Sequence, residues 1–185
     1  MSGAFDQHCM IRAVQLARRG LYTTDPNPRV GCVIAKHGQI IAEGFHARAG
    51  EPHAERHALA AAGEQAHGAT AYVTLEPCSH TGRTGPCAAA LIQAGVARVV
   101  AAMEDPNPQV AGNGFRALRE AGIAVEIGLQ ENDARALNPG FIRRMRGERP
   151  YIRIKAAASL DGRTAMASGE SQWITGPAAR EDVQR

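Results

Sequence analysis

The chain has 185 residues, which is enough for one full domain and a remainder but not for two complete cores. Apolar residue types make up 44% and charged types 21%, so the composition is that of a folded globular protein and excludes a disordered or fibrous chain. The formal net charge of +3 is too small to indicate a nucleic-acid-binding surface.

Localisation is predicted from what the chain lacks and from its cysteines. No apolar run approaches the roughly 20 residues that a membrane-spanning helix needs, so we expect no membrane partner. The first residues carry no basic region followed by an apolar one, which predicts a protein of the reducing cytoplasm. In that compartment the four cysteines indicate metal binding or catalysis rather than disulfides.

The spacing of apolar residues predicts helices alternating with short strands. A first helix over residues 5–19, with Asp6 as its N-cap, precedes two antiparallel strands at 30–35 and 40–44. The later elements are helices at 53–62, 86–94 and 114–121, strands at 71–75, 98–103 and 123–127, and a helical segment between 131 and 145. Such alternation predicts an α/β fold, a three-layer αβα sandwich around a mixed, mostly parallel sheet.

We predict two domains, the second of them incomplete. The first covers residues 1–146, and residues 147–185 hold a linker and the start of a second α/β domain. The basic segment 143–150 has a linker composition, and a new strand is expected at 151–157. The sequence Asp-Pro-Asn-Pro occurs at 25–28 and again at 105–108, and both copies are rigid turn sequences. A turn is a sufficient account of the second copy, whereas the first leaves a ligand role open for Asn27.

The clearest chemical signal is His53-Ala54-Glu55, followed by Pro77-Cys78 and, nine positions after Cys78, by Pro86-Cys87. One imidazole and two thiolates are donors that zinc prefers, and three protein ligands leave a fourth position for water. Zinc lowers the pKa of such a water from ~15.7 towards 7. We therefore predict a catalytic zinc site held by His53, Cys78 and Cys87.

Glu55 is the predicted proton carrier. Release of an amine from a nucleobase requires protonation of the leaving group, and zinc deaminases use a glutamate that is not a metal ligand for this purpose. Pro52 and Pro86 suit first helical turns, which would place His53 and Cys87 at helix N-termini, where the helix dipole favours a thiolate. Cys78 would lie at the carboxyl edge of the sheet.

The same histidine and cysteines also allow other interpretations. The histidine could be a surface residue and the cysteines buried apolar residues, or the site could be a closed structural zinc site with His57 or His80 as fourth ligand. A metalloprotease helix requires the glutamate directly after the first histidine, and the spacing here excludes it. Cys9 and Cys32 are interpreted as packing residues.

Four segments resemble the bifunctional riboflavin-biosynthesis deaminase/reductase family, a branch of the cytidine deaminase superfamily. They are residues 26–31, residues 75–87 (Leu-Glu-Pro-Cys-Ser-His-Thr-Gly-Arg-Thr-Gly-Pro-Cys), residues 155–164 and residues 171–175. The usual Pro-Cys-x-x-Cys spacing is replaced by a longer one, which is itself typical of this family. The resemblance covers nearly the whole chain.

The resemblance implies a cytidine-deaminase-like domain followed by a dihydrofolate-reductase-like one. The first would hydrolyse 2,5-diamino-6-(5-phosphoribosylamino)pyrimidin-4(3H)-one to 5-amino-6-(5-phosphoribosylamino)uracil and ammonia. The second would then use NADPH to reduce the ribosyl group. The implied cofactors are Zn²⁺, bound by His53, Cys78 and Cys87, with Glu55 as proton shuttle, and NADPH in the complete reductase domain.

The resemblance also implies substrate contacts. Asn27 and His46 would lie near the pyrimidine, and His80 and Arg83 near the phosphate. An arginine that can bind a phosphate in bidentate fashion suits that role.

In the reductase part the resemblance implies a substrate contact for Ser171 and NADP contacts for Ala157 and Trp173. Most cofactor contacts of the family lie outside these residues, so we expect no reductase activity from this chain alone. Arg56 departs from the family, where a small or β-branched apolar residue is expected. We expect its side chain to reach solvent or to pair with an acid.

The predicted partner is a small phosphoribosylated pyrimidine, without nucleic acid or membrane, and a homo-oligomer stays open. Two alternative functions remain. One is another zinc nucleoside or tRNA deaminase, which would share the metal but hold a different base. The other is a zinc-stapled binding module without catalysis.

Overall fold

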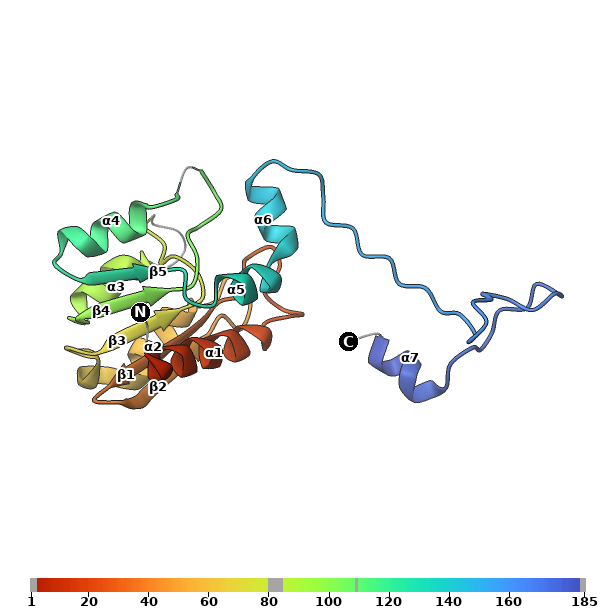
Figure 1. Ribbon diagram of the computed structural model, residues 1–185, viewed down its shortest axis with the longest axis horizontal. Coiled ribbons are helices and arrows are strands. Elements are labelled where there is room, and N and C mark those ends of the chain that lie inside the picture. Colours follow the sequence, from red (N-terminus) through yellow and green to blue (C-terminus); the bar gives the residue numbers. More distant parts are fainter. Residues whose placement is uncertain (1–2, 80–84, 109, 184–185) are drawn as a thin grey trace. The chain divides into compact units, whose positions relative to one another are not determined.

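A computed structural model describes residues 3–79, 85–108 and 110–183, and its contacts divide the chain into units of residues 1–150 and 151–185. In the first unit five strands form one sheet in the order β2-β1-β3-β4-β5 (Figure 1). Their bounds are Gly31–Lys36 (β1), Gln39–Phe45 (β2), Thr70–Val73 (β3), Arg98–Ala101 (β4) and Ala124–Ile127 (β5). Strand β1 is antiparallel to β2 and β3, whereas β3, β4 and β5 pair in parallel. All strands except β1 therefore share one direction, which confirms the mixed, mostly parallel sheet.

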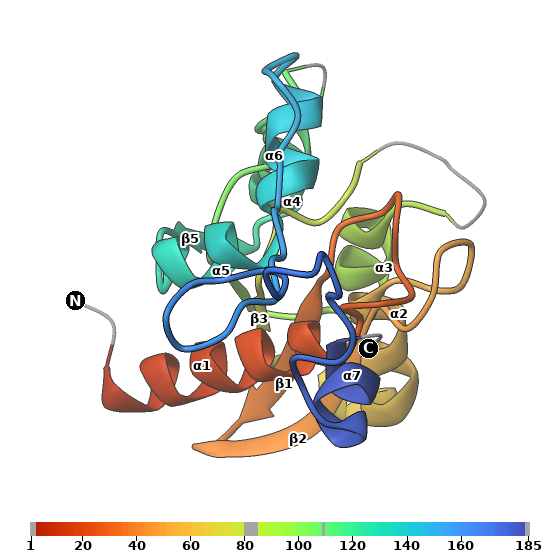
Figure 2. The same ribbon diagram turned by 90° about the vertical axis from the view of Figure 1, so that its right-hand side faces the viewer.

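Helices cover both faces of this sheet, which confirms the predicted three-layer sandwich. Helices α1 (Ala4–Arg18) and α5 (Glu131–Leu137) contact each other on one face, where Figure 2 shows α1 lying along the sheet. Helices α2 (Ala54–Ala62), α3 (Cys87–Gln93) and α4 (Asn113–Glu120) cover the other face, and the short 3₁₀ helix η1 (Gly63–Ala66) follows α2. Helix α6 (Pro139–Met145) completes the first unit.

Small residues set how closely the helices approach the sheet. A Cβ on Gly31 of β1 would stand 2.0 Å from the carbonyl oxygen of Ala13 in α1. A Cβ on Gly44 of β2 would stand 2.3 Å from the carbonyl oxygen of Ala54, so only glycine lets the start of α2 come this near. This close packing fixes the position of the segment that carries His53 and Glu55.

Four expectations for local structure are wrong. Gly3, not Asp6, is the N-cap of α1. The Asp6 carboxylate instead binds Arg98 at 2.8 Å, because a charged partner forms a stronger hydrogen bond than a backbone N–H. Pro52 precedes the N-cap His53 rather than lying in the first turn of α2. The helical segment predicted between 131 and 145 is formed, as two helices, since Pro139 disfavours helical backbone at Asn138. Pro86 lies at the N-cap of α3 rather than in its first turn.

The fourth concerns the second unit, where the predicted strand at 151–157 is not formed. These residues have no hydrogen-bonded strand neighbour among the described residues, and a strand is stable only when its backbone groups are paired. The regular helix of this unit is α7 (Pro177–Val183). In the part of the chain that the structure describes, no helix has the length and apolar character needed to cross a bilayer.

Candidate active site

Three potential metal ligands meet where three elements begin or end. His53 is the N-cap residue of α2, Cys87 is the first residue of α3, and Cys78 lies in the loop after β3. The Nδ1 atom of His53 lies 3.4 Å from Cys87 Sγ and 3.7 Å from Cys78 Sγ, and all three donor atoms lie within 4.8 Å of one another. Sequence reasoning predicted these same three residues together.

The spacing of these donors fits a zinc ion. In a tetrahedral site with zinc–sulfur bonds of ~2.3 Å and zinc–nitrogen bonds of ~2.0 Å, neighbouring donor atoms stand roughly 3.5–3.8 Å apart. The observed nitrogen–sulfur distances of 3.4 and 3.7 Å agree with this geometry. Among the described residues no fourth histidine, cysteine or acid joins the group, and His57 is not part of it. His80, the other candidate for a closed site, lies outside the described residues.

The two thiols influence each other's ionisation. Hydrogen bonding from the Cys87 thiol, then from the His53 ring and the Cys87 backbone N–H, holds the pKa of Cys78 well below its usual value. The Cys78 thiolate and burial in turn raise the pKa of Cys87. Hydrogen bonding to Cys78 also raises the pKa of His53. Two sulfurs this close favour a cation between them, because it would let both ionise.

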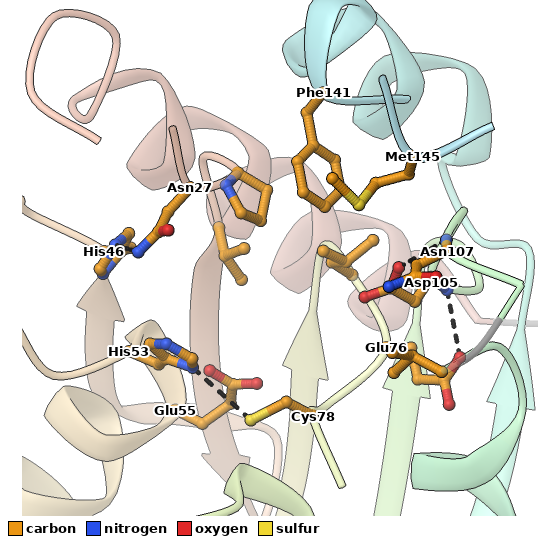
Figure 3. Close-up of a pocket in the computed structure, with 14 residues that line it drawn as sticks. Asn27, His46, His53, Glu55, Glu76, Cys78, Asp105, Asn107, Phe141 and Met145 are labelled. Carbon is orange, nitrogen blue, oxygen red and sulfur yellow. Dashed lines mark hydrogen bonds between the residues drawn. The ribbon is translucent and has the colours of Figure 1, made fainter. Parts of the chain in front are cut away.

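Glu55 lies beside this group on the first turn of α2. Its side chain is buried, and Figure 3 shows its carboxylate beside His53 and Cys78 rather than turned to solvent. Burial raises the pKa of Glu55 to about 7. A carboxyl group of this pKa can both accept and donate a proton at neutral pH.

A cavity of about 250 Å³ opens above the metal donors (Figure 3). His53, Glu55 and Cys78 are part of its lining. Polar side chains line two of its other sides, and apolar side chains lie between them. The remaining lining residues are Asn27, Pro28, Val30, His46, Leu75, Glu76, Asp105, Asn107, Val110, Phe141 and Met145. Its size suits a small heterocycle rather than a folded macromolecule.

Asn27 and His46 form one side of the cavity (Figure 3). His46 Nδ1 lies 3.2 Å from the carbonyl oxygen of Pro52, an acceptor, so this nitrogen carries the proton. His46 Nε2 therefore accepts a hydrogen bond from Asn27 Nδ2 at 3.2 Å. Burial lowers the pKa of His46, which keeps the ring neutral. The pair orients the Asn27 amide at the cavity.

Helix α6 supplies an apolar wall that sequence reasoning missed. Phe141 and Met145 point into the cavity from this helix (Figure 3). The helix is held by Asn138, whose Oδ1 accepts a hydrogen bond from the Arg29 N–H at 2.8 Å and whose Nδ2 donates to the Arg29 carbonyl at 2.9 Å. Nothing in the local pattern of residues 131–145 indicates that they pack against residue 29.

Asp105 and Asn107 were also missed, because the second Asp-Pro-Asn-Pro copy was interpreted only as a turn. It is a turn, in which the Asn107 N–H donates to Asp105 Oδ1 at 2.8 Å, but both residues also line the cavity. The repeat itself was the available signal, since the first copy was already connected with ligand binding through Asn27.

Arg56 behaves differently from the expectation. Its side chain is half-buried and neither extends to solvent nor forms an ion pair among the described residues. Its Nη2 donates to the carbonyl oxygen of Gly85 at 3.0 Å, next to Pro86 and Cys87. Arg56 thus ties the start of α2 to the start of α3, because a guanidinium group can donate to a carbonyl oxygen as well as to a carboxylate.

The structure does not test the positions of the other predicted residues relative to this site. His80 and Arg83 lie outside the described residues. Ala157, Ser171 and Trp173 belong to the second unit, where all three are exposed, and the Arg180 guanidinium lies 4.1 Å from the centre of the Trp173 ring. Cys9 and Cys32 are fully buried in the core, as expected for packing residues, and burial raises the pKa of both.

Residues 4–103 match the family model of the cytidine and deoxycytidylate deaminase zinc-binding region, and residues 150–185 match that of the RibD C-terminal domain. The chain is 68% identical to the riboflavin biosynthesis protein RibD of Escherichia coli over 179 residues, which are 97% of this chain and 49% of that protein. The chain therefore spans about half the length of the curated relatives it matches.

Two solved structures are similar to this chain over nearly its whole length. Acinetobacter baumannii RibD, form 1, is similar with a TM-score of 0.91 and 64% identity over 97% of this chain and 51% of that one. A diaminohydroxyphosphoribosylaminopyrimidine deaminase/5-amino-6-(5-phosphoribosylamino)uracil reductase from Thermotoga maritima is similar with a TM-score of 0.88 and 44% identity, over 97% and 52%.

Proposed function

Because the chain belongs to the cytidine and deoxycytidylate deaminase zinc-binding family, we propose that its first unit deaminates a phosphoribosylated diaminopyrimidine. Water adds to C2 of the pyrimidine ring, which bears one of the two amino groups. Ammonia then leaves, so that a carbonyl replaces this amine. The substrate would be 2,5-diamino-6-(5-phosphoribosylamino)pyrimidin-4(3H)-one. The Thermotoga maritima relative, 44% identical, carries this deaminase activity in its name and supports the choice.

The observation that carries the proposal is a buried carboxyl group beside three zinc-type donors at the floor of a cavity. His53, Cys78 and Cys87 would hold the metal, which when bound supplies a Lewis acid that makes water nucleophilic at neutral pH. Glu55 would take one proton from the attacking water and deliver it to the ring nitrogen, then take the second proton from the resulting hydroxyl group and deliver it to the leaving amine as the carbonyl forms. Its position in the cavity lining next to His53 and Cys78 suits both transfers.

The rest of the cavity would bind and orient the base. The Asn27 amide, fixed by neutral His46, would hydrogen-bond to polar atoms of the pyrimidine. Phe141 and Met145 would cover the ring face and exclude bulk water. His80 and Arg83 are proposed to bind the phosphate.

We propose that the deaminase domain covers residues 1–146 and that residues 147–185 hold the linker and the start of a reductase domain. The match of residues 150–185 to the RibD C-terminal domain supports this division. Ser171 would contact substrate there, and Ala157 and Trp173 would contact NADPH, in the complete domain only. The protein is proposed to act in the cytoplasm.

An ammonia-release assay tests the function. The purified chain is given the phosphoribosylated diaminopyrimidine or cytidine, beside Glu55→Gln, a variant of the same size that cannot carry the proton. We expect turnover of the first substrate only, and a loss of roughly 10²–10⁴-fold in kcat in the variant with its zinc content unchanged. Faster turnover of cytidine would refute the substrate, an active variant would refute the role of Glu55, and no turnover of either compound would favour a binding module.

A further inference from the structure

Glu76 is a buried acid to which the sequence analysis assigned no role. Its carboxylate forms no ion pair with any described residue but accepts hydrogen bonds from four backbone N–H groups. Oε2 accepts from Asp105 at 3.1 Å and Gly112 at 3.0 Å, and Oε1 accepts from Gly114 at 2.8 Å and Phe115 at 3.4 Å. One side chain thus holds both ends of the connection between β4 and α4.

The backbone around Glu76 binds the same connection. The Glu76 N–H donates to the carbonyl oxygen of Met103, at the end of β4, at 2.9 Å. Gly114 packs so tightly that a Cβ there would stand 2.0 Å from the carbonyl oxygen of Pro77 and 3.1 Å from Glu76 Oε1. The connection therefore rests directly on the segment Glu76-Pro77-Cys78, whose last residue is a proposed metal ligand.

The connection also has hydrogen bonds of its own: the Asn107 N–H donates to Asp105 Oδ1, and the N–H groups of Val110 and Ala111 donate to the Asn107 carbonyl oxygen. Pro106 and Pro108 lack an N–H group, and of the side chains in the segment, Asp105 and Asn107 face the cavity (Figure 3). Charged acceptors of several backbone N–H groups form strong hydrogen bonds, above all in a buried position. The hydrogen bonds at Asn107 lie within this cavity wall, whereas those to the Glu76 carboxylate attach the wall to the segment that carries Cys78.

We propose that Glu76 is a positioning residue. It fixes the connection between β4 and α4 and thereby places Asp105 and Asn107 at the cavity, across from Asn27 and His46. The kinetic consequence rests on the proposed deaminase function, whereas the consequence for the connection does not. Glu76 also borders the cavity, but among the described residues no hydrogen bond joins its carboxylate to the metal donors or to Glu55, so substrate binding should depend on it more than the chemical step.

The test compares Glu76→Gln with wild type by steady-state kinetics, zinc analysis and hydrogen exchange. The glutamine amide turns an NH₂ group towards two backbone donors, so about half of the hydrogen bonds are lost together with the charge. We expect amide exchange of Asp105, Gly112, Gly114 and Phe115 to accelerate by about tenfold or more, and KM to rise by about the same factor. The kcat value should change by less than about threefold, and zinc content should stay at the wild-type level.

Two further variants complete the design. Glu120→Gln removes one exposed negative charge from the end of α4 and should match wild type in every measurement. Glu76→Asp keeps the charge but is one methylene shorter, so it should raise KM in the same direction by a smaller factor, and it carries the test if Glu76→Gln does not fold.

The outcomes separate the two proposals. Exchange and KM at wild-type values in Glu76→Gln would overturn the positioning role, as would a loss of zinc in proportion to the loss of activity. If wild type shows no deaminase activity, the proposed function fails, and accelerated exchange confined to the connection would still support the role of Glu76.

Discussion

Asp6 joins α1 to strands β3 and β4 of the sheet. Replacing its carboxylate should lower the free energy of unfolding by an amount that depends on pH. Its carboxylate accepts hydrogen bonds from Arg98 Nη1 at 3.0 Å, Arg98 Nη2 at 2.8 Å and the Tyr72 hydroxyl at 2.5 Å. The Arg98 hydrogen bonds, partly opposed by burial, lower the pKa of Asp6 from 3.8 to about 2. The Asp6 side chain is only 14% exposed, so solvent screens this interaction little.

The magnitude follows from the two pKa values. A group with pKa 3.8 in the unfolded chain and about 2 in the folded one contributes about 2 kcal/mol to the free energy of unfolding at neutral pH. The folded-state pKa is depressed, so this contribution is present above pH 3.8 and is lost as the pH falls through about 2. About half of it remains at pH 3.

Urea unfolding of wild type and Asp6→Asn at pH 7 and pH 3 measures this difference. We expect the variant to be about 2 kcal/mol less stable at pH 7, with its Tm lower by roughly 4–8 °C, and the gap to shrink to about half at pH 3. Glu126→Gln, which removes an acid that is 51% exposed from the same arginine, should cost less than about 1 kcal/mol. Two results would contradict a stabilising interaction between the Asp6 carboxylate and Arg98. One is equal stability of Asp6→Asn and wild type at pH 7, and the other is a stability difference that is the same at both pH values.

Two further predictions concern the metal site. The Cys87→Ser variant should lose its zinc on dialysis because it lacks one thiolate donor. The control Cys9→Ala, a change in the core, should keep its zinc. Equal zinc content of the two variants by atomic absorption would contradict the assignment of Cys87 as a ligand. Arg56→Met keeps an apolar stem but removes the hydrogen bond to the Gly85 carbonyl, so zinc affinity in a chelator competition should fall by roughly 10-fold, as expected for a residue that supports a metal ligand. Unchanged affinity would show that Arg56 only fills space.

Local sequence patterns were enough to identify the three potential metal donors that the structure brings together and the glutamate beside them. His53 and Glu55 stand at one helix start, Cys87 at another, and Cys78 after a strand, so each position follows from a short local pattern. Zinc preference for nitrogen and sulfur donors then selects these residues from the whole chain. The layer architecture was equally accessible, because helix and strand periodicities are local properties of the sequence.

Apart from Asn27 and His46, which the resemblance had already named, the residues around the cavity became known only from long-range contacts in the fold. Asn138 binds the backbone of Arg29 from 109 positions away, and through this contact Phe141 and Met145 reach the site. Glu76 binds the backbone of residues 29 to 39 positions later, and Asp6 finds Arg98 92 positions later instead of capping its own helix. Such contacts have no periodicity or fixed spacing, since any buried polar group takes the strongest partner that folding brings within reach.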